Sequence, residues 1–221
     1  MAKTDDRDSE LRSAVFVGDG QRLVAALLQE PWGDRLQLAS DALLLALVRD
    51  VERASDLAHQ CTSQQRARGW VGDDDLADLL DAALGERPVP MLRPLPVDLE
   101  ELSAVLEGDP AHSGGRIDLR TGEVWPRAAI DYAREMGEDD ADGEDPDCWL
   151  AAWCEGSRAA YRDMENFIET VSDEDRADRL SIAISGRGAF RRFKDILARW
   201  PGELERWYAF SDEHQRGRAR A

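Results

Sequence analysis

A chain of 221 residues with 43% hydrophobic residues has enough apolar side chains to form a globular core. Its net charge of -18 argues against nucleic-acid binding by the surface as a whole, because phosphate groups would be repelled before they made contact. The longest apolar run, residues 42–48, is too short to cross a bilayer, and the N-terminus is acidic where a signal peptide needs positive charge; we therefore expect a cytoplasmic protein without a membrane partner.

The N-terminal half predicts helices. Residues 9–17 and 21–28 have apolar side chains at helical spacing and are separated by Gly18-Asp19-Gly20. An alternative, a strand followed by a phosphate-binding loop, lacks the third glycine and the lysine of such loops. The same periodicity predicts a helix over 41–58 and another over 73–84, whose first three residues are aspartates. We expect these aspartates to interact only with the positive end of the helix dipole.

Four prolines between residues 88 and 96 exclude a continuous helix and favour an extended backbone. We interpret residues 88–97 as a linker between a helical N-terminal domain, residues 1–87, and an α+β domain, residues 98–221. A proline-rich ligand for an aromatic groove is the alternative interpretation.

The hydrophobic period changes after a short helix at 98–106. Residues 116–120 and 123–125 alternate around Thr121-Gly122, which predicts a β-hairpin, and residues 148–154 favour a third strand over a helix. The segment 138–147 between them has seven carboxylates and no cation, so we expect a solvated loop. It lacks the glutamate that a calcium-binding loop needs at its twelfth position.

Three more helices and a fourth after Pro201 follow. Ser157 is expected to cap the helix over 157–171, Ser172 and Asp175 to form a capping box for 176–184, and Ala189 to open a helix with one buried face. That face contains Phe190, Phe193, Leu197 and Trp200. The predicted fold class is α+β and mostly helical, with a helical N-terminal half and a C-terminal half in which a small antiparallel sheet packs against helices around the central stretch 186–200.

The charge is unevenly distributed. From residue 187 to the end there are nine Lys or Arg and five Asp or Glu, a net charge of +4 in a chain of -18. The cluster lies at the start of the central helix, where free backbone amides also attract anions. The candidate anion-binding residues are Gly186, Arg187, Gly188, Arg191, Arg192 and Lys194. The alternative is that these cations form ordinary ion pairs with the protein's own excess of acid.

Four sequence strings extend the argument to a family. They are DLRTGEVW at 118–125, SRAAYRDMENFIETV at 157–171, GRGAFRRFKDIL at 186–197 and ERWYAFSDE at 205–213. With them the chain resembles the bacterial uncharacterised protein family numbered zero one five eight. The family has no established activity, substrate or cofactor, so the resemblance implies no catalytic residue.

The usual catalytic and metal-binding patterns are absent from the sequence. No HExxH, GxSxG or Walker string occurs, and the three cysteines, Cys61, Cys148 and Cys154, have no CxxC spacing. We expect free, mostly buried thiols, no metal and no cofactor. The expected function is that of a non-enzymatic binding or adaptor protein with a protein partner or a second copy of itself. The alternative is a regulator that binds a nucleotide or nucleic acid through the 186–194 cluster, although we expect no nucleic-acid partner at so small a positive charge.

Overall fold

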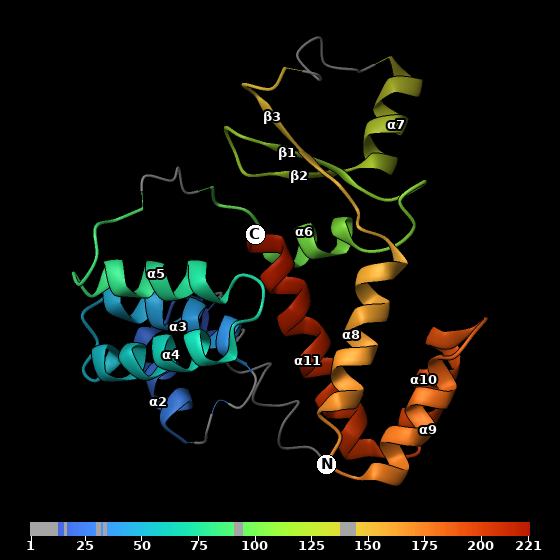
Figure 1. Ribbon diagram of the computed structural model, residues 1–221. Coiled ribbons are helices and arrows are strands. Elements are labelled where there is room, and N and C mark those ends of the chain that lie inside the picture. The colour runs from blue at the N-terminus through green and yellow to red at the C-terminus, as the bar shows by residue number, and fades with distance from the viewer. Residues whose placement is uncertain (1–12, 16, 30–31, 33–34, 91–94, 138–144) are drawn as a thin grey trace. The chain divides into compact units, whose positions relative to one another are not determined.

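A computed structural model describes residues 13–15, 17–29, 32, 35–90, 95–137 and 145–221. Its contacts divide the chain into two units: the first contains residues 1–91 and 194–221, and the second contains residues 92–193 (Figure 1). One boundary lies inside the proline-rich segment 88–97. The other lies within a helix, between Phe193 and Lys194, so the last 28 residues group with the N-terminal helices, whereas the sequence analysis placed them in a domain spanning 98–221.

The first unit is helical. Helices α3, α4 and α5 contact one another, and α2 and α11 both contact α3 (Figure 1). Their bounds are α2 (Gly20–Gln29), α3 (Leu36–Val48), α4 (Ala54–Arg68), α5 (Asp73–Ala83) and α11 (Pro201–Arg220). The helix predicted over 9–17 lies mostly outside the described residues, whereas α2, α5 and α11 match the predicted segments.

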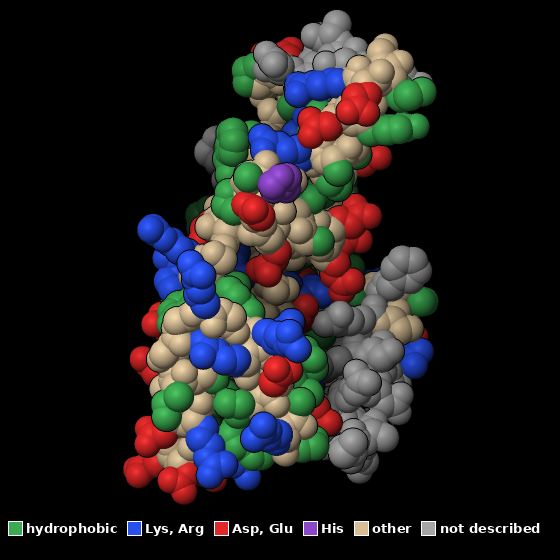
Figure 2. Space-filling model, turned by 90° about the vertical axis from the view of Figure 1, so that its right-hand side faces the viewer, with side chains coloured by type: hydrophobic (Ala, Val, Ile, Leu, Met, Phe, Trp, Pro, Cys, Tyr) green, Lys and Arg blue, Asp and Glu red, His purple; other side chains and the backbone are tan. Residues whose placement is uncertain are grey.

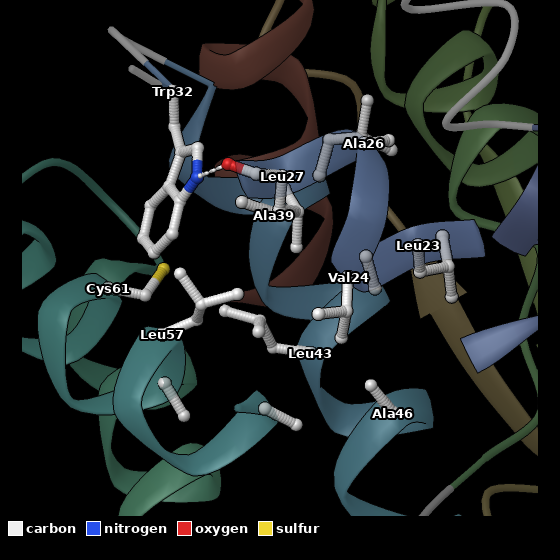
Figure 3. Packing of buried hydrophobic residues seen from close by; sticks show 14 of the residues in the cluster. Leu23, Val24, Ala26, Leu27, Trp32, Ala39, Leu43, Ala46, Leu57 and Cys61 are labelled. Atoms are coloured by element: carbon white, nitrogen blue, oxygen red, sulfur yellow. Dashed lines mark hydrogen bonds between the residues drawn. The ribbon is translucent and has the colours of Figure 1, made fainter. Parts of the chain in front are cut away.

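The core of this unit is formed by leucine, alanine and valine side chains of α2, α3 and α4 (Figure 3). Leu23 and Leu43 are fully buried, and Trp32 closes the cluster beside Cys61. The Trp32 indole N–H donates to the Leu27 carbonyl at 2.9 Å, so its polar atom is satisfied at the edge of the core. Burial of the side chains, and not helix propensity, accounts for the stability of such short helices.

The helix predicted over 41–58 is wrong in one respect, because two helices occupy this segment. The chain leaves α3 at Arg49 and begins α4 at Ala54, and both Asp50 and Arg53 adopt positive φ, of 52° and 69°. A left-handed residue ends an α-helix whatever the hydrophobic period of the flanking residues. The apolar pattern continued through the break and concealed it.

A buried carboxylate of α11 holds the beginning of α3. Glu213 is 2% exposed, and its two oxygens accept the backbone N–H groups of Gln37 and Leu38 at 2.8 and 3.2 Å. These amides belong to the first turn of α3, where no intrahelical acceptor exists. Glu213 therefore caps a helix that precedes it by about 175 residues in the chain, and burial raises the pKa of its carboxyl to about 7.

Arg68 connects this cap to α5. Its guanidinium donates to Glu213 at 3.1 Å and, through two nitrogens, to Asp73 at 2.8 and 2.6 Å. Asp73 also accepts the Gln37 side-chain amide and the Trp70 backbone N–H. The sequence analysis gave Asp73 only an interaction with the helix dipole; the structure instead places it, fully buried, in a network that joins α3, α4, α5 and α11.

Two glycines allow α11 to approach the turn before α5 backbone to backbone. A Cβ atom on Gly217 would lie 2.1 Å from the Val71 carbonyl oxygen, and one on Gly72 would lie 2.7 Å from the Gly217 oxygen. Real Cβ atoms do not approach backbone so closely, so any other residue at 217 would move the helix. The close contact places Glu213 within reach of α3.

The second unit contains a three-stranded antiparallel sheet of order β2-β1-β3. Its strands are β1 (Gly115–Asp118), β2 (Val124–Pro126) and β3 (Trp149–Ala152), which confirms the predicted hairpin and third strand. Gly122 has a φ of 79° in the turn, as the hairpin pattern required. Ile117 of β1 pairs with Val124 on one side and Leu150 on the other, and α6 (Leu99–Leu106) contacts β2 and β3.

The helices of this unit are α7 (Arg127–Met136), α8 (Ser157–Glu169), α9 (Glu174–Ile184) and α10 (Ala189–Leu197). The sequence analysis did not assign α7. The predicted helix starts also need correction: Gly156, not Ser157, is the N-cap of α8, and Asp173, not Ser172, caps α9 by accepting the Arg176 N–H at 3.1 Å. The overall fold class, α+β and mostly helical, is as predicted.

Replacing Glu213 tests the capping interaction. We expect Glu213→Ala to lower the free energy of unfolding by about 3 kcal/mol or more, because it leaves two helix amides without their buried acceptor and removes one of the two carboxylates that pair with Arg68 among the described residues. Chemical denaturation monitored by circular dichroism measures the change. Glu205→Ala, on the same helix, should change stability by less than about 0.5 kcal/mol. Equal effects of the two substitutions would contradict the capping role.

Because His214 is largely buried, we expect the protein to lose stability in acid. Burial lowers the pKa of His214 from 6.5 to about 4, and its ring lies between Trp70 and Phe210 with centroid distances of 4.2 and 4.4 Å. The unfolded state therefore binds a proton at a higher pH than the folded state does, so this group destabilises the fold as the pH falls from 6.5 to 4. Comparison of the wild type with His214→Phe should show a shallower decrease for the variant in that window, and parallel curves would exclude His214 as the cause.

Candidate functional site

The turn between α9 and α10 requires its two glycines. Gly186 and Gly188 have φ of 83° and 76°, a region that other residues rarely adopt. Arg187 between them is exposed, and the first intrahelical bond of α10 is made by the Arg192 N–H to the Gly188 carbonyl at 3.1 Å. The amides of Ala189 and Phe190 precede that bond. The backbone thus turns sharply into a helix, as the sequence predicted.

One of the predicted anion-binding arginines interacts with the protein itself. The Arg192 guanidinium donates to the Ser185 carbonyl at 2.5 Å, and the Tyr161 hydroxyl donates to the Ile184 carbonyl at 3.2 Å. Both carbonyls lie at the C-terminal end of α9, where helical acceptors have no intrahelical donor and the dipole is negative. Arg192 therefore stabilises the end of α9.

The remaining cations of the predicted cluster are exposed on and before α10. Arg191 and Lys194 are three residues apart and lie on one side of the helix. Lys194 begins the C-terminal segment of the first unit, residues 194–221, whereas Gly186, Arg187, Gly188, Arg191 and Arg192 belong to the second. The sequence-predicted residues are thus neighbours along one turn and one helix, and one of them, Arg192, binds the end of α9.

A small cavity lies beside this turn. It has a volume of about 280 Å³ and is lined by Arg158, Tyr161 and Arg162 of α8, with Ser157 at its start, and by Phe190 of α10. We call this surface, together with Arg187, the α8–α10 face. Phe190 was expected in the buried face of α10 with Phe193 and Leu197; these two are buried, but 40% of Phe190 is exposed. An aromatic ring flanked by arginines is typical of a binding surface and not of a core.

The arginines of the α8–α10 face differ in their partners. Arg162 forms an ion pair with Glu155 at 3.0 Å, both side chains being largely exposed. Arg158 is exposed and forms no ion pair within the described part of the chain. Figure 2 shows this side of the molecule, with blue Lys and Arg side chains among green hydrophobic ones over its lower half. Sequence analysis missed Arg158, Tyr161 and Arg162, although their spacing in SRAAYR places them on one side of a helix.

Clusters of metal ligands and reactive thiols are two further kinds of chemical site. Across the described ranges, no group of three His, Cys, Asp or Glu side chains could hold a metal ion. Cys61 is buried, and burial raises the pKa of its thiol to about 12, which keeps it protonated and unreactive. Cys148 and Cys154 are half-buried free thiols, so fewer of the cysteines are fully buried than expected.

Within the described residues, no helix has both the length and the apolar character needed to cross a membrane.

Comparison with known proteins places one part of the chain in context. No curated protein and no solved structure matches the chain. One family model does match, over residues 157–221, which include α8, α9, α10 and α11 and therefore all residues of the α8–α10 face. The match confirms the predicted resemblance for this segment, whereas the DLRTGEVW string lies outside it. Residues 157–221 are thus similar to the uncharacterised protein family UPF0158.

Proposed function

We propose that the protein is a cytoplasmic, non-enzymatic binding or adaptor protein that uses the α8–α10 face to contact an acidic segment of a protein partner. The observation that carries the proposal is the cavity that Phe190, which is 40% exposed, lines together with Arg158 and Arg162. An exposed aromatic ring supplies apolar contact area, and the neighbouring guanidinium groups select for carboxylates.

The size and chemistry of the face favour a segment of a protein over a small substrate. A cavity of about 280 Å³ is at the lower limit for small-molecule sites, which usually exceed about 300 Å³ and enclose their ligand. A carboxylate side chain with its neighbouring apolar residue fits the combination of Arg158 and Phe190. The turn at Gly186 and Gly188 contributes a further exposed cation, Arg187, three residues before Phe190 in the chain.

Arg192 is outside the proposed contact. Because its guanidinium already binds the Ser185 carbonyl, substituting it would disturb the end of α9 and confuse a loss of structure with a loss of binding. Arg158 and Arg187 are the better targets, since each is exposed and forms no ion pair among the residues that the structure describes.

The test is direct binding of a defined acidic probe. A fluorescein-labelled peptide of ten glutamates should bind the wild type in a fluorescence anisotropy titration at 50 mM salt, and Arg158→Glu with Arg187→Glu should weaken binding at least fivefold because the reversed charges repel the peptide. Phe190→Ala should weaken the binding of a peptide that alternates glutamate and leucine more than that of the glutamate peptide.

Two controls separate this result from trivial causes. Arg199→Glu reverses one charge at an exposed position beyond α10 and should leave binding within twofold of the wild type. Inorganic phosphate, ATP and a 20-nucleotide single-stranded RNA are titrated in parallel. RNA binding that is tighter than peptide binding and lost in the Arg158→Glu, Arg187→Glu variant would favour the nucleic-acid regulator, and no binding by any probe would remove the proposed face.

A further inference from the structure

A second, larger cavity lies elsewhere in the second unit, along the edge of its sheet. Its volume is about 710 Å³, within the range of ligand-binding sites. One wall is α7, with Arg127, Ile130 and Arg134, and the other is β3 and its continuation, with Trp149, Leu150 and Trp153. We call this cavity the β3 groove. It shares no lining residue with the α8–α10 face.

The hydrogen-bond pattern of the sheet shows which backbone groups of β3 point away from β1. Leu119 donates to the Cys148 carbonyl at 2.8 Å, and the register pairs Ile117 with Leu150. Because hydrogen-bonded pairs alternate along antiparallel strands, residues 148, 150 and 152 direct their backbone groups to β1. Residues 149, 151 and 153 direct theirs away from the sheet.

The outward backbone groups of Ala151 have no partner in the described structure. The Trp149 N–H donates to the Asp145 carbonyl at 2.9 Å, but neither the N–H nor the carbonyl of Ala151 pairs with any described residue. Strand β3 is at the edge of the sheet, since the order is β2-β1-β3. Among the described residues, the outer edge of β3 is therefore open at Ala151, a residue that also lines the groove.

This edge lacks the features that usually protect an open strand. Natural edges are covered, bulged or supplied with charged residues, whereas residues 149–153 read Trp-Leu-Ala-Ala-Trp. Leu150 is 51% and Trp153 76% exposed. An apolar, uncharged edge with large exposed side chains is the kind of surface to which an extended chain adds as a further strand.

The opposite wall supplies positive charge. Arg127, Ile130 and Arg134 are spaced so that they share one face of α7, and the two arginines are about 10 Å apart along the helix axis. Arg116 adds a third charge below the groove, its guanidinium 3.9 Å from the ring centre of Trp149. Asp131 is the one acid among the lining residues.

Helix α7 itself has no buried residue. Ile130 is half-buried, and Tyr132 and Met136 are 63% and 59% exposed; green side chains stand out in the upper part of Figure 2, where α7 lies. Helices of globular domains normally bury one face. A chain lying in the groove would cover the face of α7 that carries Ile130.

We infer that the β3 groove binds an extended acidic segment of a partner protein, which pairs with β3 as a fourth strand. The segment's backbone accepts the Ala151 N–H and donates to its carbonyl, its apolar side chains cover Trp153 and Leu150, and its carboxylates face Arg127 and Arg134. A second copy of β3 would not supply these carboxylates, because residues 149–153 contain no acid.

The experiment begins with selection of dodecapeptides from a random display library on the full chain, followed by anisotropy titration of the enriched peptides. Ala151→Pro removes the outward N–H without touching the ladder to β1, and proline is tolerated on an edge strand when its nitrogen faces outward. We expect it to weaken binding at least tenfold. Ala151→Val, which keeps the N–H, should bind within threefold of the wild type.

Charge and aromatic contacts are tested separately. Arg127→Glu with Arg134→Glu should abolish binding of the enriched peptides, which we expect to be acidic, and Trp153→Ala should weaken it at least fivefold. If Ala151→Pro proves unfolded by circular dichroism, amide hydrogen exchange of the wild type replaces it: exchange at Ala151 should slow at least tenfold when the peptide is bound.

Three outcomes would overturn the inference. One is that the selection enriches no peptide that binds the groove. Another is that enriched peptides bind Ala151→Pro and the wild type equally, with no slowing of exchange at Ala151. The third is that a nucleotide such as ATP binds the groove, with loss in Trp153→Ala and no effect of Ala151→Pro, which would identify a stacking site for a small anion in place of strand addition.

Discussion

The first unit depends on one carboxylate, Glu213, whose burial costs free energy. Glu213 gives up its hydration, and its raised pKa reflects that cost, yet each of its oxygens accepts a first-turn amide of α3. A water-exposed cap could satisfy the same amides, but it would not fix the position of α11. Because Arg68 and Asp73 complete the network, the beginning of α3, the end of α4 and the beginning of α5 are held by the same group on α11.

The backbone contact between Gly217 and Val71 restricts the positions that α11 can take. A helix that approaches to backbone distance can direct a short side chain such as glutamate onto two specific amides. Any displacement of α11 would break the glutamate contacts and the ion pairs of Asp41 with Arg216 and Arg220 together. The loss would be cooperative, since the groups share partners.

Local patterns in the sequence were sufficient where an element is determined by its own residues. The hairpin followed from alternation around Thr121-Gly122, and α5 and α6 followed from helical spacing with acidic starts. The break between α3 and α4 could not be predicted, because Asp50 and Arg53 adopt left-handed conformations that neither residue type favours strongly by itself. The role of Asp73 depends on Arg68 and on a residue 140 positions away, so no local pattern encodes it.

For the candidate surfaces too, some features can be predicted from the sequence and others only from the fold. The glycines and cations of 186–194 are visible in the sequence, but only the fold shows that Arg192 is used by α9 and that Phe190 is exposed. The open edge of β3 is even harder to predict from the sequence. Whether the backbone groups of Ala151 point toward β1 or toward the open edge depends on the register of the sheet, and a shift of one residue would reverse it.

The charge of the second unit restricts how an acidic ligand can bind. Residues 92–193 contain 24 Asp or Glu and 12 Arg, so an approaching acidic segment is repelled at distances beyond the local arginines. Screening at physiological salt reduces that repulsion over about 8 Å, while contacts with Arg127, Arg134 or Arg158 act at shorter range. Affinity must then come mainly from aromatic contacts and, in the β3 groove, from backbone hydrogen bonds, which depend little on salt. Added salt would therefore accelerate association by screening the repulsion and accelerate dissociation by weakening the arginine contacts, and the equilibrium affinity would change less than either rate. A long nucleic acid has many more phosphates than the few arginines can contact. Its remaining phosphates would be repelled by the acidic surface, and no aromatic or backbone contacts would offset that repulsion.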